Sequence, residues 1–256
     1  MHEYLSSLDR FAFDARGYLL FEDVLAAAVI DDLEGAIAGR GLPPAGDSIE
    51  SQRFGWHGEL FGWHQGFRDL IDHPLVCAVL DAFIGAYARL DHAYGIVMAP
   101  GTSGLGVHGP ATPFDPAQFY VHRAGAIRSG LLSFSWALRD GRPGAGGFGC
   151  IPGSHRADEP LPPGADSLVQ EVPQPAGSLL VFTEALVHCT LPWTGAGERR
   201  VLLYKYSPGS STWAPAEPPP PAALQAMTER QRRLVEPPYV GGRKPWDDPH
   251  PASPDG

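Results

Sequence analysis

The chain has 256 residues, a formal charge of −10 and 43% hydrophobic residues, so it is long enough to bury a substantial core. It contains no block of Lys and Arg, which argues against a nucleic-acid partner, and no apolar run long enough for a membrane helix. The three cysteines, Cys77, Cys150 and Cys189, form no CxxC pair, and the N-terminus lacks a signal-peptide pattern. We therefore expect a cytoplasmic protein without disulfides.

The first third of the chain predicts helices. Apolar residues recur at helical spacing between 24 and 38, and Gly17 marks the end of an earlier helix. Residues 40–66 are rich in Gly and polar residues and predict an excursion from regular structure. The elements expected in this part are a helix at 5–15, a strand at 18–21, a helix at 24–38 and a helix at 67–86 that breaks near Pro74.

From residue 89 onward, short apolar runs alternate with Gly and Pro, which is typical of a sandwich or barrel. The strands expected here lie at 90–98, 104–108, 130–138, 147–151, 168–172, 178–183 and 200–206. Helices followed by a run of strands predict a mainly β fold buttressed by N-terminal helices. We expect one domain over 1–242, with a helical part at 1–88, a β core at 89–207 and an extension at 208–242 that holds a helix near 221–234. The polar, Pro-rich residues 243–256 predict a disordered tail.

One histidine and one arginine have the spacing expected of part of a non-haem iron site. Iron(II) oxygenases bind the metal through two His and one carboxylate, and 2-oxoglutarate needs an Arg because guanidinium pairs bidentately with carboxylate. His188 follows the strand at 178–183, and Arg199 lies eleven residues later on the returning strand. This hairpin-like spacing can bring both side chains into one pocket.

Two segments resemble the phytanoyl-CoA dioxygenase family of Fe(II)/2-oxoglutarate-dependent oxygenases. Gly147-Phe-Gly-Cys-Ile-Pro-Gly-Ser-His-Arg156 looks like the family's PGSH segment, and Gly177-Ser-Leu-Leu-Val-Phe-Thr-Glu-Ala-Leu-Val-His188 looks like the segment that carries its distal His. The resemblance covers roughly 10–207 in the family's order. It implies a double-stranded β-helix, or cupin-like jelly roll, with His108 and His188 as iron ligands and Arg199 as the 2-oxoglutarate clamp. Ser133 and Ser135, which alternate on the strand at 130–138, are expected to line the cosubstrate pocket.

The proximal motif departs from the family, because Pro110 stands where the carboxylate of His-x-Asp is expected. Glu184 could supply the carboxylate, since one helical turn over 183–188 would place it on the same face as His188. Asp115 is a second candidate, although an Asp before Pro usually forms a turn. A third alternative leaves the position to chloride, as in iron halogenases that resemble this superfamily.

The expected function is a dioxygenase that uses Fe(II), 2-oxoglutarate and molecular oxygen to oxidise a C–H bond of a small molecule. Hydroxylation is the default outcome, with His108, His188 and Glu184 at the metal. Two alternatives stay open: a chloride-dependent halogenase, and a metal-free binding protein on the same jelly-roll scaffold.

Overall fold

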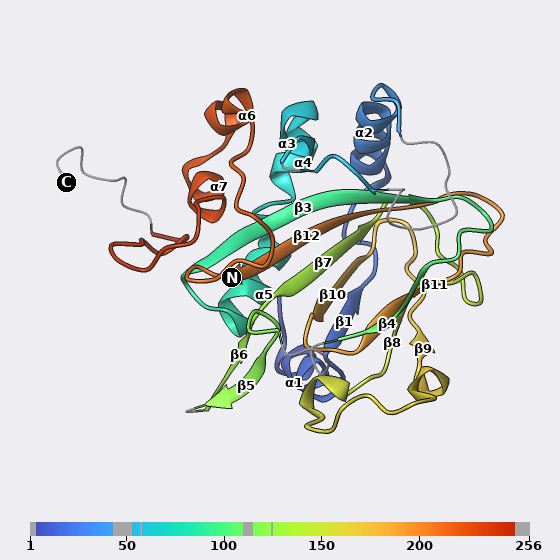
Figure 1. Ribbon diagram of the computed structural model, residues 1–256. Helices are drawn as coiled ribbons and strands as arrows, with labels where there is room; N and C mark the ends of the chain where they lie inside the picture. Colours follow the sequence, from blue (N-terminus) through green and yellow to red (C-terminus); the bar gives the residue numbers. More distant parts are fainter. Residues whose placement is uncertain (1–3, 43–52, 57, 110–114, 124, 249–256) are drawn as a thin grey trace.

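Two antiparallel sheets form the core of the protein in the computed structural model, which describes residues 4–42, 53–56, 58–109, 115–123 and 125–248 (Figure 1). The six-stranded sheet has the order β1 (Tyr18–Phe21), β10 (Leu179–Thr183), β7 (Leu132–Ala137), β12 (Arg199–Pro208), β3 (Ala88–Met98) and β2 (Arg53–Phe54). The four-stranded sheet has the order β4 (Leu105–His108), β11 (His188–Leu191), β8 (Gly147–Cys150) and β9 (Gln170–Glu171). A separate hairpin pairs β5 (Tyr120–Arg123) with β6 (Ala126–Ser129).

Helices from both ends of the chain cover the outer face of the six-stranded sheet (Figure 1). The helices are α1 (Ser7–Arg16), α2 (Ala27–Ala38), α3 (Leu60–Trp63), α4 (Gln65–Asp69), α5 (Pro74–Phe83), α6 (Pro221–Ala226) and α7 (Glu229–Leu234), with 3-10 turns at Ser154–Arg156 and Ala165–Leu168. The mainly β fold with flanking helices that the sequence predicts is confirmed. Across the described ranges, no helix combines the length and apolar character needed to cross a membrane.

Local sequence explains how α1 leads into the sheet. Ser6 and Asp9 form a capping box at its start, and Gly17 ends it with φ 83°. A Cβ at Gly17 would lie 2.7 Å from His155 Nδ1 and 2.8 Å from a Leu186 methyl group. Glycine is therefore required here both for its backbone conformation and for the close approach of the PGSH loop.

Alternation along β12 divides its side chains between the helical layer and the space between the sheets. The hydroxyl of Tyr204 donates to the Phe67 carbonyl at 2.8 Å, and that of Tyr206 donates to the Ile71 carbonyl at 2.7 Å. Both tyrosines are buried under the helices. Lys205, between them, points the opposite way and lines the cavity described below.

Several boundaries differ from those the sequence predicts. The expected helix at 67–86 breaks as predicted, because Pro74 begins α5 after a new N-cap at His73. The expected helix near 221–234 is two helices, since Met227 is extended and Thr228 starts a second capping box. The segment 183–188 is a turn that leads into β11 at His188, not a helical turn.

The chain stays packed beyond residue 242, where the sequence predicts a disordered tail. Trp246 is buried, and its backbone N–H donates to the Ala86 carbonyl at 3.0 Å. Its indole N–H reaches the Gly85 carbonyl at 3.3 Å. The expectation of disorder from residue 243 is therefore wrong for 243–248, because one large aromatic side chain anchors that segment. Residues 249–256 lie outside the described ranges.

Candidate active site

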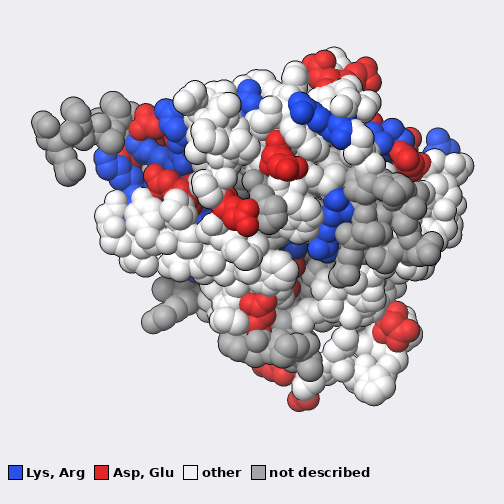
Figure 2. Space-filling model, turned by 45° about the horizontal axis from the view of Figure 1, so that its top comes forward, with Lys and Arg blue, Asp and Glu red and all other residues white. Residues whose placement is uncertain are grey.

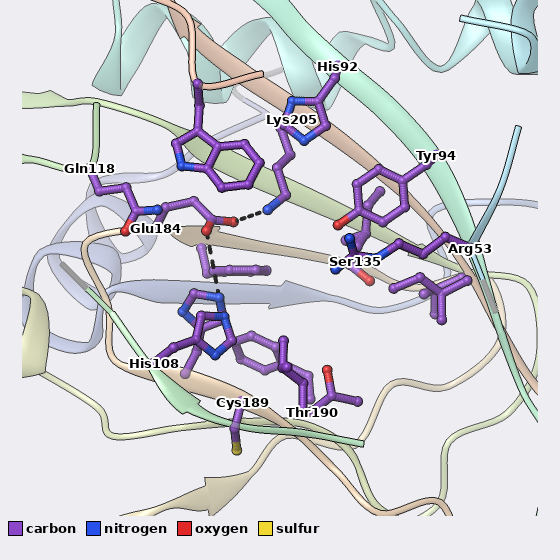
Figure 3. A pocket seen from close by; sticks show the side chains of 18 of the residues that line it. Arg53, His92, Tyr94, His108, Gln118, Ser135, Glu184, Cys189, Thr190 and Lys205 are labelled. Atoms are coloured by element: carbon purple, nitrogen blue, oxygen red, sulfur yellow. Dashed lines mark ion pairs between the residues drawn. The ribbon is translucent and has the colours of Figure 1, made fainter. Parts of the chain in front are cut away.

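A cavity of about 300 Å³ lies between the two sheets. Its walls come from the inward-facing residues of β3, β7, β10 and β12 on one side, and from β4, β8 and β11 on the other (Figure 3). The lining residues used below are Arg53, Trp56, His92, Tyr94, His108, Ser135, Glu184, His188, Arg199, Lys205 and Trp213. Strand register brings distant segments together here: on β12, Lys205 lies opposite both Ser133 of β7 and His92 of β3.

His108 and His188 face each other at one end of the cavity. They are paired in register between β4 and β11, and their ring centroids are 4.2 Å apart. Each ring directs Nδ1 at a nearby backbone carbonyl, that of Gly106 at 2.8 Å for His108 and that of Leu186 at 2.7 Å for His188. A carbonyl only accepts, so Nδ1 carries the hydrogen in both rings and each Nε2 keeps its lone pair. This is the tautomer that a metal-binding histidine needs.

Glu184 is the one acidic side chain among the described residues that line this cavity. Lys205 Nζ lies 2.8 Å from its Oε1, and the hydroxyl of Ser133 donates to the same oxygen. The other oxygen, Oε2, lies 3.7 Å from His188 Nε2 (Figure 3). One carboxylate oxygen is thus held by the protein while the other faces the histidine pair.

Burial sets the charges of this group. Desolvation lowers the pKa of His188 to about 4, more strongly than the nearby Glu184 carboxylate raises it, so His188 is neutral at pH 7. Burial alone would raise the pKa of Glu184, but Lys205, His188 and Ser133 together lower it to about 2. The site therefore presents two neighbouring donors of the types that iron(II) accepts, neutral imidazole and ionised carboxylate.

Arg199 lies at the start of β12 and is buried without an acidic partner among the described residues. Its Nη1 lies 3.6 Å from Met98 Sδ, and its Nη2 lies 3.4 Å from Gln174 Oε1. Burial lowers the pKa of Arg199 to about 10, which leaves it charged at pH 7. A buried, uncompensated guanidinium that lines a cavity is suited to bind the carboxylate of a ligand.

The two expected pocket serines have different positions. Ser135 lines the cavity, and its hydroxyl donates to Gln174 Oε1 at 3.3 Å. Ser133 is buried and bonded to Glu184, and it is not part of the lining.

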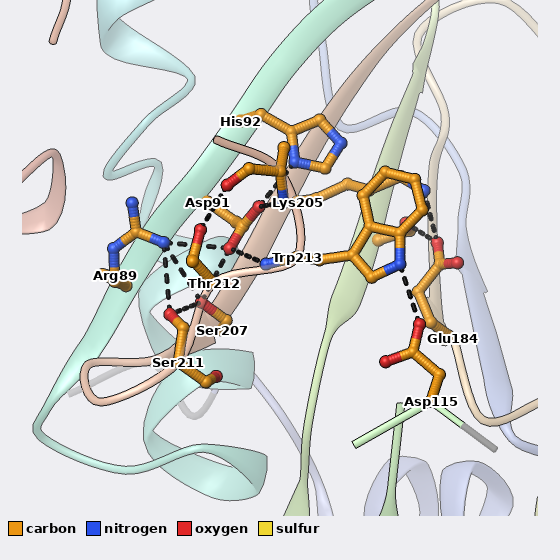
Figure 4. Close-up of polar contacts among 12 residues, drawn as sticks. Arg89, Asp91, His92, Asp115, Glu184, Lys205, Ser207, Ser211, Thr212 and Trp213 are labelled. Carbon is orange, nitrogen blue, oxygen red and sulfur yellow. Dashed lines mark hydrogen bonds and ion pairs between the residues drawn. The ribbon is translucent and has the colours of Figure 1, made fainter. Parts of the chain in front are cut away.

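Asp115 does not face the histidine pair. Its Oδ1 accepts from the Ala117 N–H at 2.8 Å, and its Oδ2 accepts from the indole N–H of Trp213 at 2.9 Å (Figure 4). These contacts match the turn role usual for an Asp before Pro. Pro110 lies outside the described residues.

The residues that sequence reasoning singled out converge, but they do not yet form a closed metal site. His108, His188, Glu184, Ser135 and Arg199 all line one cavity. In the part of the chain that the structure describes, no three His, Cys, Asp or Glu side chains stand in an arrangement that could hold a metal ion. The donor set fits an iron centre chemically, with two imidazoles in place and Glu184 beside them.

Sequence reasoning missed several lining residues. The sequence predicts Lys205 only as a strand residue and gives no signal for His92 and Arg53, which also line the cavity. It gives no signal either for Gln174, which contacts Arg199 from outside the lining. Only strand alternation could have pointed to Lys205, because Leu203 and Lys205 share the face opposite Tyr204.

The sequence profile of the phytanoyl-CoA dioxygenase (PhyH) family matches residues 13–201. The chain belongs to the phytanoyl-CoA dioxygenase family. It is accordingly a non-haem Fe/2-oxoglutarate-dependent enzyme of the oxygenase type, and the expected enzyme class is confirmed. No curated protein matches the chain at the sequence level.

Solved structures share the fold of this PhyH-family chain. HygX from Streptomyces hygroscopicus with nickel and 2-oxoglutarate bound has a TM-score of 0.70 and 21% identity, over 82% of this chain and 90% of that one. The same protein with nickel, 2-oxoglutarate and hygromycin B bound has a TM-score of 0.69 and 21% identity over the same shares. SnoK, a non-haem alpha-ketoglutarate-dependent carbocyclase from nogalamycin biosynthesis, has a TM-score of 0.62 and 19% identity, over 94% of this chain and 96% of that one. The jelly-roll core expected from the sequence is thereby confirmed, and the expected cofactors, Fe(II) and 2-oxoglutarate, agree with those of the family and its solved relatives.

Proposed function

We propose that this protein oxidises a C–H bond of a small molecule, by hydroxylation, with Fe(II) held by His108, His188 and Glu184 and 2-oxoglutarate clamped by Arg199. The observation that carries the proposal is the histidine pair. Both Nδ1 atoms donate hydrogen bonds to backbone carbonyls, so both Nε2 lone pairs are available. The same cavity contains Arg199, which is buried and has no acidic partner among the described residues. When bound, iron(II) and 2-oxoglutarate supply the oxygen-dependent oxidation itself.

Glu184 is proposed as the third ligand through Oε2. Its Oε1 is fixed by Lys205 and Ser133, so the carboxylate cannot turn freely and Oε2 is the oxygen beside His188 Nε2. Fixing the outer oxygen of a ligating carboxylate is the usual role of the groups around a metal site. A chloride ion in the same place would stand beside this buried negative charge, which disfavours the halogenase alternative.

The remaining residues have binding and orienting roles. The charge of Arg199 would pair with the distal carboxylate of 2-oxoglutarate, and Gln174 and Ser135 orient the guanidinium. Burial excludes water from the Arg199 and His188 side chains, which strengthens each electrostatic contact made there.

An anaerobic titration with Fe(II) and 2-oxoglutarate tests this assignment, because the bound pair has a weak visible charge-transfer band. Wild type should show the band. Arg199→Ala should weaken 2-oxoglutarate binding at least about 100-fold, since an ion pair to a buried charge is worth roughly 3 kcal/mol or more. Arg142→Ala, which removes an exposed arginine, is the matched control and should behave as wild type.

Two variants separate a ligand role of Glu184 from a structural one. Glu184→Ala removes the acidic partner of Lys205 and leaves that charge buried. A loss of iron binding in this variant would therefore not distinguish a ligand role of Glu184 from a structural one. The double variant Glu184→Gln/Lys205→Met removes both charges. Retained iron binding in the double variant would exclude Glu184 as a ligand, and a band that then depends on chloride would favour the halogenase alternative. Absence of any band in wild type would overturn the proposal and leave a metal-free binding protein.

A further inference from the structure

Asp91 and His92 form a buried pair at the edge of the same cavity, away from the proposed iron ligands (Figure 4). Asp91 Oδ1 lies 2.7 Å from His92 Nδ1. The Asp91 carboxylate also accepts from Arg89 Nη1 at 2.9 Å, from the Trp213 N–H at 2.9 Å and from the Ala214 N–H at 3.1 Å. Asp91 is thus ionised and fixed from several directions, and it holds the imidazole in one orientation.

A β-bulge makes this pairing possible. On β12, Lys205 lies opposite His92, but the next residue, Tyr206, lies opposite Leu90. Asp91 is therefore the extra residue on β3 and has no partner in the ladder. Bulges re-aim side chains and are found next to active sites. Here the bulge lets Asp91 bond the neighbouring imidazole while His92 keeps its place on the inward face.

The second ring nitrogen of His92 has no hydrogen-bond partner among the described residues, although it is buried. Because a carboxylate only accepts, Nδ1 carries the hydrogen and Nε2 is an acceptor. Burial also lowers the pKa of His92, which keeps the ring neutral. A buried acceptor in a cavity wall that receives no hydrogen bond from the protein is expected to receive one from a ligand.

His92 stands where two cavities meet. It lines the 300 Å³ cavity that contains the histidine pair and a second cavity of about 420 Å³. Arg53, Trp56 and Trp213 also line both. A molecule that enters through the second cavity would pass His92 on its way to His108 and His188.

Aromatic rings surround this junction. The His92 ring lies 5.5 Å from Trp213, 5.8 Å from Tyr94 and 6.1 Å from Trp56, with interplanar angles of 25°, 4° and 14°. Nearly parallel ring faces favour a ligand with a flat or cyclic apolar face.

The charge of the junction limits the ligand further. The Arg53 guanidinium lies 5.5 Å from the Trp56 ring centroid and 5.1 Å from that of Tyr94. Figure 2 shows both basic and acidic side chains on one face of the molecule. Among the described residues, however, Arg53 is the one Arg, Lys, Asp or Glu that lines both cavities. A cationic ligand is therefore disfavoured.

We propose that the Asp91–His92 pair is the substrate-recognition element, with His92 Nε2 accepting a hydrogen bond from a hydroxyl group of a neutral, ring-containing substrate. This inference rests on the proposed function, since it treats the cavity as the substrate site. It adds the substrate class, a hydroxylated ring compound without positive charge, and it assigns specificity to a residue outside the metal and 2-oxoglutarate groups.

Matched naphthalene probes test the inference on the protein loaded with Ni(II) and 2-oxoglutarate. 2-Naphthol offers a ring and a hydroxyl donor, 2-methoxynaphthalene offers the ring without the donor, and 2-naphthylmethylamine adds a positive charge. In wild type, the dissociation constant measured by ligand-detected NMR should be at least about 10-fold lower for 2-naphthol than for 2-methoxynaphthalene. The reason is that the ether has no hydrogen to donate to His92 Nε2. The amine should bind most weakly.

The His92→Phe variant should reduce the 2-naphthol preference to near unity, and His92→Gln, which keeps an acceptor, should retain part of it. A merely structural role would weaken both probes equally and leave their ratio unchanged, which would overturn the inference. Equal binding of the two probes in wild type, or no binding of either below 1 mM, would also overturn it. The iron charge-transfer band should be unchanged in His92→Phe, so failure here is distinguishable from failure of the proposed iron site.

Discussion

Arg199 carries a full charge in a buried position with no carboxylate beside it among the described residues. Such an arrangement is costly in the ligand-free protein, because a buried charge that lacks a counter-ion forfeits its hydration. The lowered pKa of Arg199, caused by burial alone, reflects that cost. We therefore interpret Arg199 as a residue whose ion-pair partner is the carboxylate of a bound ligand.

Gln174→Glu should give Arg199 a permanent ion-pair partner within the protein. The new carboxylate would replace the amide oxygen 3.4 Å from Nη2, so 2-oxoglutarate would have to compete with a permanent partner. We expect its dissociation constant, measured by anaerobic calorimetry with Mn(II) present, to rise about 100-fold, which corresponds to roughly 3 kcal/mol.

Gln174→Met is the matched control, since it keeps the shape of the side chain and adds no charge. Its affinity for 2-oxoglutarate should fall only a few-fold. The ligand-free Gln174→Glu protein should be at least as stable as the Met variant, because Arg199 gains a counter-ion. Equal 2-oxoglutarate affinity in the two variants would show that Arg199 is not the clamp.

The sequence could identify some of these residues but not others. His188 and Arg199 stand at a hairpin-like spacing, the family resemblance adds His108, and all three line one cavity. Lys205, His92 and Gln174 carry no such signal. Their positions depend on the register of β12 with β3 and β7 and on a loop conformation, neither of which follows from local periodicity.

At the scale of elements, helix ends with strong local signals agree with the sequence. Short strands agree in part: β1, β4 and β8 lie where the sequence predicts strands, whereas others have no such prediction. Ser6, Gly17 and Pro74 mark helix ends through capping and fixed φ, and these effects act within a few residues. The β5–β6 hairpin is not predicted, although its two strands are neighbours in the sequence. Strand β11 is not predicted either, because it is defined by partners far away in the chain, His108 and Cys150 among them. Trp246 belongs to the same class, since its burial depends on a contact with Gly85, 161 residues away.

Truncation tests the C-terminal anchor. A chain that ends after residue 248 keeps Trp246, and its melting temperature should match that of the full chain. A chain that ends after residue 242 loses this buried indole and the contacts of Arg243 with the Pro237 carbonyl. Removing a large buried aromatic costs roughly 3–5 kcal/mol, and for a protein of this size each kcal/mol lowers the melting temperature by about 2–4 °C. Calorimetry should show a fall of roughly 6–20 °C, and equal melting temperatures for the two truncations would contradict the anchor role.

At the scale of the whole molecule, the candidate site joins the two sheets. His108 and His188 belong to the four-stranded sheet, whereas Arg199 and Lys205 belong to the six-stranded sheet. Glu184 sits in the turn between β10 and β11, which connects one sheet to the other. A metal on the histidines and a dicarboxylate on Arg199 would therefore bind to different sheets, and a ligand that contacts both would couple them.

Thermal unfolding should reveal that coupling as synergy. Ni(II) alone and 2-oxoglutarate alone should each stabilise the protein modestly. Together they should raise the melting temperature by more than the sum, because 2-oxoglutarate can contact both the metal and Arg199. A ligand at 100 times its dissociation constant adds about 2.7 kcal/mol, or roughly 5–10 °C for a chain of this size.

Glutarate is the matched control, since it has both carboxylates but lacks the 2-oxo group needed to chelate the metal. Its effect with Ni(II) should be additive, and the synergy with 2-oxoglutarate should vanish in Arg199→Ala and in His188→Ala. Additive shifts for 2-oxoglutarate in wild type would mean that metal and cosubstrate bind independently, and the two sheets would then not share one catalytic centre.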